Sequence, residues 1–332
     1  MAGNAGWFLV GLIALAFGAE VMVRGGAQLA SRLGISPMMV GLTVVSIGTS
    51  LPELAVGITA ALEGSGELAV GNIAGTNVVN VLFILGLSAL LRPLAIERRT
   101  LRFDLPAMAA AAVLLWALSA DGVLSRLDGT MLVVGALVYT AILAYLSRQE
   151  SRDAEIPSVR AHLGEANAVN ANQSTSVSGA STARLIGMTV AGIAVVVLGA
   201  EWLVDGAVGL ARGLGVSDAL IGLTIVAIGT SAPELVTMLV STMRGERDIA
   251  LGNLLGSSVY NVLLILGVTC LVPAYGLTLS PALVWIDIPI MMAAALVCIP
   301  IFFSGRRVHR AEGFGMVVAY LLYLAFLLST QA

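Results

Sequence analysis

The sequence predicts an all-α polytopic membrane protein, with ten transmembrane helices in two inverted-topology five-helix repeats. Three observations support this fold class: a very apolar composition, ten long apolar segments and an internal repeat. The 332 residues are 58% hydrophobic and 11% charged, with a mean hydropathy of +0.97, whereas an average soluble domain is about 25% charged. So few charges could not cover the surface of a soluble fold, and no basic tract indicates nucleic-acid binding.

Ten apolar segments approach or reach the roughly 17–25 residues that a helix needs to cross a membrane. They must be helical, because lipid cannot hydrogen-bond to a free backbone. No positive charge precedes Arg24, so we expect the first segment to be retained rather than cleaved as a signal peptide. In the first half the segments are Trp7–Val23, Pro37–Leu62, Leu68–Leu91, Leu105–Ala120 and Met131–Leu146. In the second half they are Leu185–Val204, Ala219–Met243, Ile249–Val272, Ala282–Phe303 and Phe314–Leu328.

One polar stretch, Ser147–Thr182, separates the two groups of five segments. It is rich in Asn, Ser and Ala and lacks apolar periodicity, which is typical of a flexible linker. The predicted organisation is therefore a first repeat over residues 1–147, a cytoplasmic flexible linker over 148–183 and a second repeat over 184–332.

The arginines predict the orientation of the chain. All 17 basic residues are Arg, and ten spans place 15 of them on one side of the membrane, with only Arg126 and Arg212 on the other. The positive-inside rule assigns the arginine-rich side to the cytoplasm. We therefore expect a multi-pass protein of the cell (inner or plasma) membrane, with both termini outside the cytoplasm.

The internal repeat is long and free of gaps. Residues 18–91 align with residues 199–272, and 34 of the 74 positions are identical. The repeated motifs span 41–86 and 222–267, and GLTVVSIGTSLPEL in the first corresponds to GLTIVAIGTSAPEL in the second. Because each half has an odd number of spans, the halves enter the membrane from opposite sides. Inverted repeats of this kind build transporters whose central site opens alternately to the two sides.

Each repeat places one glutamate deep inside an apolar segment. Glu53 lies in the second span and Glu234 in the seventh. A carboxylate at the centre of a bilayer costs about 2.5–3.5 kcal/mol on insertion scales, so such a residue is usually functional. A structural ion pair is the alternative, but no Arg lies near that depth in any predicted span.

Further oxygen donors accompany both glutamates. The spacing of Thr49, Ser50 and Glu53 places them on one helix face, and Thr76 and Asn80 share a stripe of the third span. The second repeat has the equivalent residues Thr230, Ser231, Glu234, Ser257 and Asn261. The amides could instead be interhelical hydrogen-bonding groups, or could serve both purposes.

A proline precedes each glutamate. Pro52 and Pro233 lack an N–H, which leaves the carbonyls of Gly48 and Gly229 without a backbone donor. We expect the helices to loosen around residues 46–48 and 227–229. A carbonyl freed at that depth needs a partner, which a bound cation could supply; a kink that serves packing is the alternative.

The donor set consists of hard oxygen atoms, since both histidines, His162 and His309, lie in predicted loops. Carboxylate, hydroxyl, amide and carbonyl oxygens suit Ca²⁺, Na⁺ or Mg²⁺ rather than zinc, copper or iron. Two glutamates balance one Ca²⁺ or two Na⁺, and an empty site would leave two like charges desolvated. This balance favours exchange over leak. We expect transported ions in a lipid bilayer, with no cofactor, no obligatory protein partner and no enzymatic activity.

At these motifs the sequence resembles the sodium/calcium exchanger family, within the calcium/cation antiporter superfamily, in its compact prokaryotic form. Two copies of GTS-x-PE, each followed by GN-x-x-G-[ST]-x-x-x-N, are similar to the α-repeats of that family. The resemblance implies overlapping calcium and sodium subsites, and first and sixth helices that slide to switch access. It implies side-chain ligands at Glu53, Glu234, Thr49, Ser50, Thr76, Asn80, Thr230, Ser231 and Ser257, and main-chain carbonyl ligands at Ser46 and Ala227.

Asn261 is the remaining candidate for the site. Some relatives, including potassium-dependent exchangers, have Asp at this position. An amide cannot titrate and adds no charge, so we expect no potassium cotransport.

Other functions remain as alternatives. A proton/calcium antiporter could use the same glutamates, although proton-coupled relatives usually lack GTS-x-PE. A passive cation channel fits the inverted repeat poorly, and a membrane enzyme would need a nucleophile–base pair that the spans do not show. Near the ends of the first and sixth spans, Glu20, Glu201 and Asp205 could line an access path or be solvated at the interface.

Overall fold

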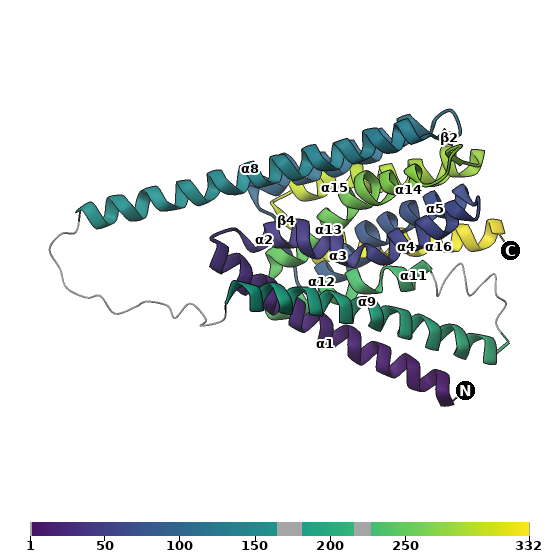
Figure 1. Ribbon diagram of the computed structural model, residues 1–332, viewed down its shortest axis with the longest axis horizontal. Helices are drawn as coiled ribbons and strands as arrows, with labels where there is room; N and C mark the ends of the chain where they lie inside the picture. The colour runs from purple at the N-terminus through teal and green to yellow at the C-terminus, as the bar shows by residue number, and fades with distance from the viewer. Residues whose placement is uncertain (1, 165–180, 216–226, 332) are drawn as a thin grey trace.

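The computed structural model describes residues 2–164, 181–215 and 227–331, and these fold into a bundle of long helices (Figure 1). Eight helices in the described ranges are long and apolar enough to cross a membrane, and the count is nine if the bent pair Pro37–Thr49 and Leu51–Leu62 is taken as one span. The all-α membrane fold is therefore confirmed. The predicted seventh span begins at Ala219, and its first residues lie outside the described ranges, so the count of ten stays a prediction.

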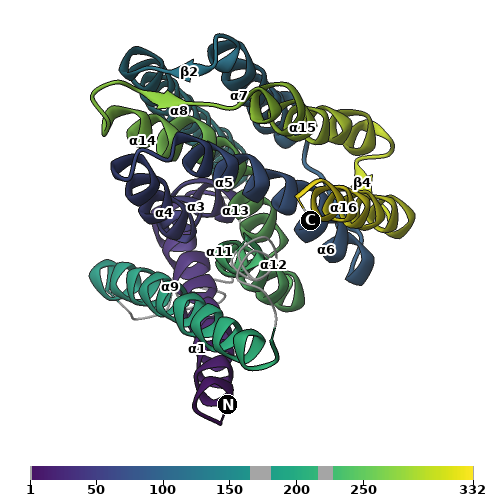
Figure 2. The same cartoon turned by 90° about the vertical axis from the view of Figure 1, so that its right-hand side faces the viewer.

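The first and sixth spans are the longest candidate membrane spans among the described residues. Helix α1 (Ala2–Leu33) and helix α9 (Thr182–Gly213) have 32 residues each, which corresponds to about 48 Å. They lie side by side along one flank of the bundle (Figures 1 and 2). Because the hydrocarbon core is only about 30 Å thick, helices of this length cross it at a tilt or extend beyond it.

Glycines bring α1 and α9 into backbone contact. A Cβ atom at Gly18 would lie 2.8 Å from the backbone nitrogen of Val196, and one at Gly192 would lie 2.7 Å from Cα of Met22. Small residues allow this close approach, which supports helix association in lipid. The glycines of this seam are spaced seven residues apart on each helix: Gly11, Gly18 and Gly25 on α1, and Gly192, Gly199 and Gly206 on α9.

The second span is broken at its centre. It comprises α2 (Pro37–Val40), the π-helical turn η1 (Gly41–Val45), α3 (Ser46–Thr49) and α4 (Leu51–Leu62), with a bend of 40°. The described part of the seventh span has the same break, between α11 (Ala227–Thr230) and α12 (Ala232–Arg244). Ser50 and Ser231 are the non-helical residues, with nearly identical φ/ψ of −85°/7° and −86°/4°.

The position of the break corrects the sequence prediction. We expected loosening around residues 46–48 and 227–229, but Ser46–Thr49 and Ala227–Thr230 are helical and the chain breaks two residues before each proline. A proline is tolerated in the first turn of a helix, where an N–H has no partner anyway. Pro52 and Pro233 therefore start new helices rather than kink continuous ones.

The third and eighth spans form the centre of the bundle. The third comprises α5 (Gly66–Val78), η2 (Val79–Ile84) and α6 (Leu85–Leu91), and the eighth comprises α13 (Arg247–Tyr260), η5 (Asn261–Leu266) and α14 (Gly267–Leu271). In the most apolar part of each, 78% and 83% of the residues are buried, against 44% or less in the six other single helices long enough to span a membrane. Both contain a π-helical turn, which occurs often at functional sites, and these turns include Asn80 and Asn261.

Helices of the outer layer enclose this centre (Figure 2). They are η3 (Thr100–Asp104) with α7 (Leu105–Ser119), α8 (Arg126–Gly164), η6 (Leu283–Asp287) with α15 (Ile288–Phe303), and α16 (Arg310–Gln331). Helix α8 runs beyond the bundle, so residues 148–164 of the predicted flexible linker are helical (Figure 1). This part contains three Arg, two Glu and two Ala, which extend an existing helix at little cost. Residues 165–180 of the predicted linker lie outside the described residues.

Two short strand pairs join the halves at opposite ends of the bundle (Figure 1). Strand β1 (Leu94–Ala95) pairs with β4 (Arg307–Val308), and β2 (Val123–Leu124) pairs with β3 (Leu277–Thr278), both antiparallel. Strand β1 follows the third span and pairs with β4, which precedes the tenth span. Strand β3 follows the eighth span and pairs with β2, which precedes the fifth span. This exchange is the pattern expected for two inverted repeats related by a two-fold axis.

The glycine seam predicts the effect of a larger side chain. Gly192→Leu should lower the melting temperature of the detergent-solubilised protein, because overpacking against the backbone of Met22 costs about 1–3 kcal/mol. Gly187→Leu on the same helix is the control, since no described atom lies within 4 Å of a Cβ built there. Equal melting temperatures for the two variants would contradict a packed seam.

Candidate cation site

The two glutamates lie at equivalent positions beside the two breaks. Glu53 is in the first turn of α4 and Glu234 in the first turn of α12, and both are fully buried. The two carboxylates are close enough to repel each other. The positive end of a helix dipole favours a carboxylate at such a position, but it cannot balance two buried charges. The structure thus brings together the two residues that the sequence singled out.

The serines at the breaks do not cap the helices that follow them. Ser-x-Pro-Glu matches the capping-box pattern, in which the serine and glutamate side chains bind backbone N–H groups. Neither Ser50 nor Ser231 makes such a bond. Both serines are buried, and both hydroxyls lack a hydrogen-bond partner in the described part of the chain. The hydroxyl groups are therefore available to a ligand.

The eighth span contributes a polar contact to Glu234. The hydroxyl of Ser257, on α13, donates to Oε1 of Glu234 at 3.4 Å. The Ser257 hydroxyl is also 3.4 Å from the hydroxyl of Thr49, on α3. Ser257, Thr49 and Glu234 therefore form one cluster that combines the two repeats.

The third span places its candidates against the second repeat. Thr76 lies on α5, which contacts α11, and Asn80 lies on η2, which contacts α12. Both side chains are buried. Thr230 is half-buried at the end of α11, and Ala227 begins the same helix. The third span thus packs against the broken seventh span. In the same way, the eighth span packs against the broken second span, where α13 contacts α3.

Unpartnered polar atoms are concentrated in this region. A buried donor or acceptor without a partner costs about 1–3 kcal/mol, so their concentration is best explained by a ligand. Among the described residues, the candidate-site atoms without a hydrogen-bond partner are Ser50 Oγ, both carboxylate oxygens of Glu53, Thr76 Oγ1, Asn80 Oδ1 and Nδ2, Ser231 Oγ, Glu234 Oε2 and Asn261 Oδ1. All but one of these atoms are oxygens.

Ser46 and Thr49 also fix the broken span to the eighth span. The Ser46 hydroxyl lies within hydrogen-bonding distance of two carbonyls, that of Gly41 at 2.6 Å and that of Asn253 at 2.9 Å, and the Thr49 hydroxyl donates to Asn253 Oδ1 at 3.1 Å. The Ser46 carbonyl accepts a hydrogen bond from the Ser50 N–H at 3.1 Å. These bonds hold α3 against α13 and position the start of α4.

Asn77 is a site residue that the sequence analysis missed. Its Nδ2 donates to the carbonyl of Ser258 at 3.1 Å, and its Oδ1 accepts from Asn261 Nδ2 at 3.4 Å. A carbonyl can only accept, so the bond to Ser258 fixes which way the Asn77 amide points. Asn261 must then offer its NH₂ to Asn77 and direct its own oxygen elsewhere. The 181-residue offset that pairs Asn77 with Ser258 was visible in the sequence, but their contact was not.

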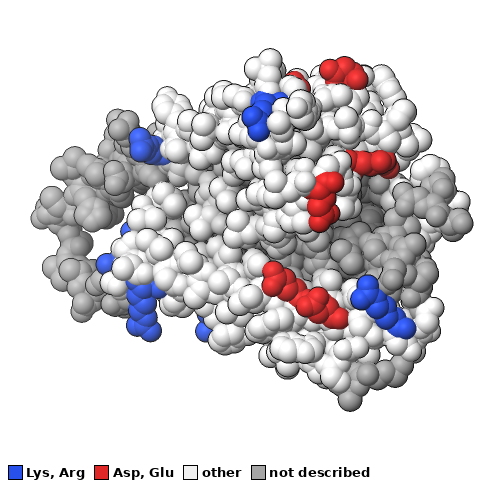
Figure 3. Space-filling model, turned by 45° about the vertical axis from the view of Figure 1, so that its right-hand side comes forward, with Lys and Arg blue, Asp and Glu red and all other residues white. Residues whose placement is uncertain are grey.

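The acidic residues expected near the ends of the first and sixth spans lie inside α1 and α9, because these helices continue to Leu33 and Gly213. Glu20 forms ion pairs with Arg24 and Arg244, so the structure makes it part of a salt-bridge cluster. Glu201 and Asp205 are exposed. Figure 3 shows the acidic side chains gathered in one half of the visible face, with most of the arginines toward the opposite end. This asymmetry agrees with the arginine distribution read from the sequence.

An oxygen-lined buried site between two inverted helical halves is typical of cation transporters. Residues 3–145 and 184–329 match a sequence model of the family described as sodium/calcium exchanger protein. The chain therefore belongs to the sodium/calcium exchanger family, a family of transporters rather than enzymes, which supports antiport of calcium against another cation.

Individual relatives agree with this assignment. The sodium/calcium exchanger MaX1 of Methanosarcina acetivorans is 32% identical over 343 residues, covering 96% of each chain. Inner membrane protein YrbG of Escherichia coli is 37% identical over 270 residues, covering 80% of this chain and 78% of that protein. The structure of the sodium/calcium exchanger from Methanococcus jannaschii is similar with a TM-score of 0.80 and 26% identity, covering 97% of both chains.

Proposed function

We propose that this protein exchanges Na⁺ for Ca²⁺ across the cell membrane by alternating access, and that Glu53 and Glu234 bind both ions. The observation that carries the proposal is the pair of fully buried carboxylates at matching helix breaks. Unpartnered oxygens of both repeats surround them. The family membership and the relatives named as sodium/calcium exchangers support sodium as the counter-ion.

Charge balance explains why such a site would exchange ions rather than leak them. Two carboxylates in a low-dielectric interior repel each other and lose their hydration. One Ca²⁺ or two Na⁺ neutralise them, so the loaded protein changes conformation more easily than the empty one. Transport in one direction then depends on counter-ions that return in the other.

The proposed ligands can supply a complete calcium shell. Calcium takes six to eight oxygen ligands and tolerates irregular geometry. Glu53 and Glu234 would contribute carboxylates, and the main-chain carbonyls of Ser46 and Ala227 would complete the set. The proposed hydroxyl and amide ligands are Thr49, Ser50, Thr76, Asn80, Thr230, Ser231, Ser257 and Asn261.

The same physics allows a proton/calcium antiporter, because a buried glutamate can also carry a proton. Uptake of ⁴⁵Ca²⁺ into proteoliposomes separates the two functions. An outward sodium gradient should drive uptake at clamped pH, whereas a proton gradient without sodium should not. Potassium should have no effect, because Asn261 adds no charge to the site. Calcium uptake driven by a proton gradient alone would show that protons, and not sodium ions, are the counter-ion.

The orientation is part of the proposal. We propose that the arginine-rich end, which includes Arg24, Arg244 and Arg306, faces the cytoplasm and that both termini lie outside it. Labelling of single cysteines introduced near the two termini of intact cells tests this orientation.

Removal of one carboxylate should abolish calcium transport. Glu53→Gln and Glu234→Gln should each lower sodium-driven calcium uptake at least about a hundredfold, because an unbalanced buried charge costs about 3–5 kcal/mol. The matched control is Glu63→Gln, which changes an exposed carboxylate at the end of α4. Normal uptake by either site variant would overturn the two-glutamate site.

Asn77 should affect the affinity for ions through its hydrogen bond with Asn261. Asn77→Leu removes the acceptor that holds the Asn261 amide, so the half-saturating Na⁺ and Ca²⁺ concentrations should rise about fivefold, as expected for one hydrogen bond. The maximal rate should change much less, whereas a purely structural defect would lower it. Ser258→Ala is the control, because it keeps the carbonyl that binds Asn77. Unchanged affinities in Asn77→Leu, or an equal change in Ser258→Ala, would contradict this role.

A further inference from the structure

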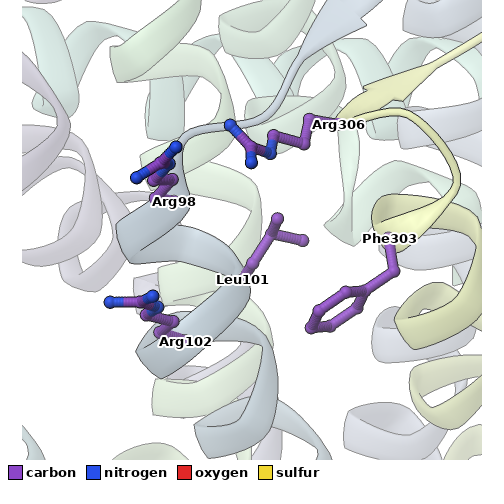
Figure 4. A pocket seen from close by; sticks show the side chains of 5 residues that line it. All are labelled: Arg98, Leu101, Arg102, Phe303 and Arg306. Atoms are coloured by element: carbon purple, nitrogen blue, oxygen red, sulfur yellow. The ribbon is translucent and has the colours of Figure 1, made fainter.

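A cavity lined by arginines lies at the arginine-rich end of the bundle, away from the candidate cation site. Its volume is about 420 Å³, and it is lined by Arg98, Leu101, Arg102, Phe303 and Arg306. Figure 4 shows Arg306 extending from the loop after α15 toward the helix that carries the other two arginines. Arg98 and Arg102 belong to the first repeat and Arg306 to the second, so both halves contribute positive charge.

The three guanidinium groups are not balanced by acidic side chains. No carboxylate lines the cavity, and none of the three arginines forms an ion pair with a residue in the described ranges. All three side chains are exposed, and an anion bound beside them would supply the charge pairing that the described acidic side chains do not provide. Arginine is well suited to this role, since its planar fork binds phosphate oxygens in pairs.

The backbone at Arg306 supports a built site. Its φ of +56° is the only positive value at a non-glycine residue in the part of the chain that the structure describes. The left-handed conformation costs an ordinary L-residue about 1–2 kcal/mol, and such strain concentrates at ligand-binding positions. A hydrogen bond from the Ile96 N–H to the Arg306 carbonyl at 2.8 Å, next to the β1–β4 pair, holds this conformation.

The apolar part of the cavity indicates what kind of anion fits. Phe303 is the last residue of α15 and is 60% exposed, and Leu101 lies at the start of the fourth span. These residues are at the ends of membrane-spanning helices, where lipid headgroups meet acyl chains. A ligand here contacts cationic groups and the exposed ring of Phe303 at once, which a soluble anion would not require.

A neighbouring cavity extends the positive surface. It has a volume of about 320 Å³ and is lined by Arg92, Pro93, Ala95, Arg247 and Arg307. Arg307 follows Arg306 directly and pairs with Ala95 in the short ladder. The two cavities therefore lie on either side of one strand pair and present six arginines at the same end of the protein.

We propose that the cavity formed by Arg98, Arg102 and Arg306 binds the phosphate of an anionic phospholipid in the leaflet at the arginine-rich end. Leu101 and Phe303 contact the beginning of the acyl chains. Basic pockets between helices at the cytoplasmic surface recognise such headgroups. A bound lipid would bridge the fourth and ninth spans, and so would stabilise the packing of one repeat against the other.

Thermal unfolding of the full-length, delipidated protein in neutral detergent tests this site. Short-chain phosphatidylglycerol should raise the melting temperature saturably, whereas phosphatidylcholine of the same chain length and inorganic phosphate should not. Arg306→Gly should raise the half-saturating phosphatidylglycerol concentration about fivefold, the contribution of one arginine near an anionic lipid. Without lipid this variant should be no less stable than the wild type, since glycine adopts positive φ without strain. Arg98→Gln provides a second variant with the same expected loss of lipid affinity.

The control is Arg184→Gln, an exposed arginine at the start of α9 that lines neither cavity and should keep wild-type lipid affinity. Equal stabilisation by phosphatidylcholine, or equal shifts in the control and the cavity variants, would overturn the proposal. Stabilisation by inorganic phosphate alone would assign the site to a soluble phosphate compound instead. No response to any of these probes would likewise overturn the proposal.

Discussion

The constraint on which the rest of the structure depends is the burial of two carboxylates in the centre of an apolar bundle. Each charge alone would oppose folding in a membrane, and together they repel each other. The broken second and seventh spans place both glutamates in first helical turns, where the helix dipole favours them. The surrounding hydroxyl and amide oxygens, together with a cation, can then offset the remaining cost of burying the two charges.

The two-fold relation of the halves determines how this site is assembled. Each broken span packs on the third span of the opposite half, so neither repeat can form the site alone. The exchanged strand pairs and the glycine seam between α1 and α9 follow the same relation. Because the halves are inverted, interchanging their conformations would expose the same ligands to the other side of the membrane, which gives alternating access a structural basis.

The sequence was sufficient for the features that depend on composition and repetition. Hydropathy predicted the helical membrane fold, and the GTS-x-PE repeats predicted that Glu53 and Glu234 would lie together. Features that depend on tertiary packing were missed. The break falls at Ser50 because Pro52 starts a helix rather than bending one, and local spacing did not reveal this. The orientation of Asn77 depends on a carbonyl 181 residues away. The helical residues 148–164 look like a linker because their composition is polar, although it favours a helix.

The central claim is that one divalent cation binds between the two glutamates. The most direct measurement is anomalous scattering from crystals soaked in Sr²⁺ as a calcium substitute. The account predicts a single strong peak coordinated by carboxylate oxygens of both Glu53 and Glu234, and its loss when sodium is present in large excess. A peak coordinated by only one of these residues, or a peak elsewhere that sodium does not displace, would contradict the account.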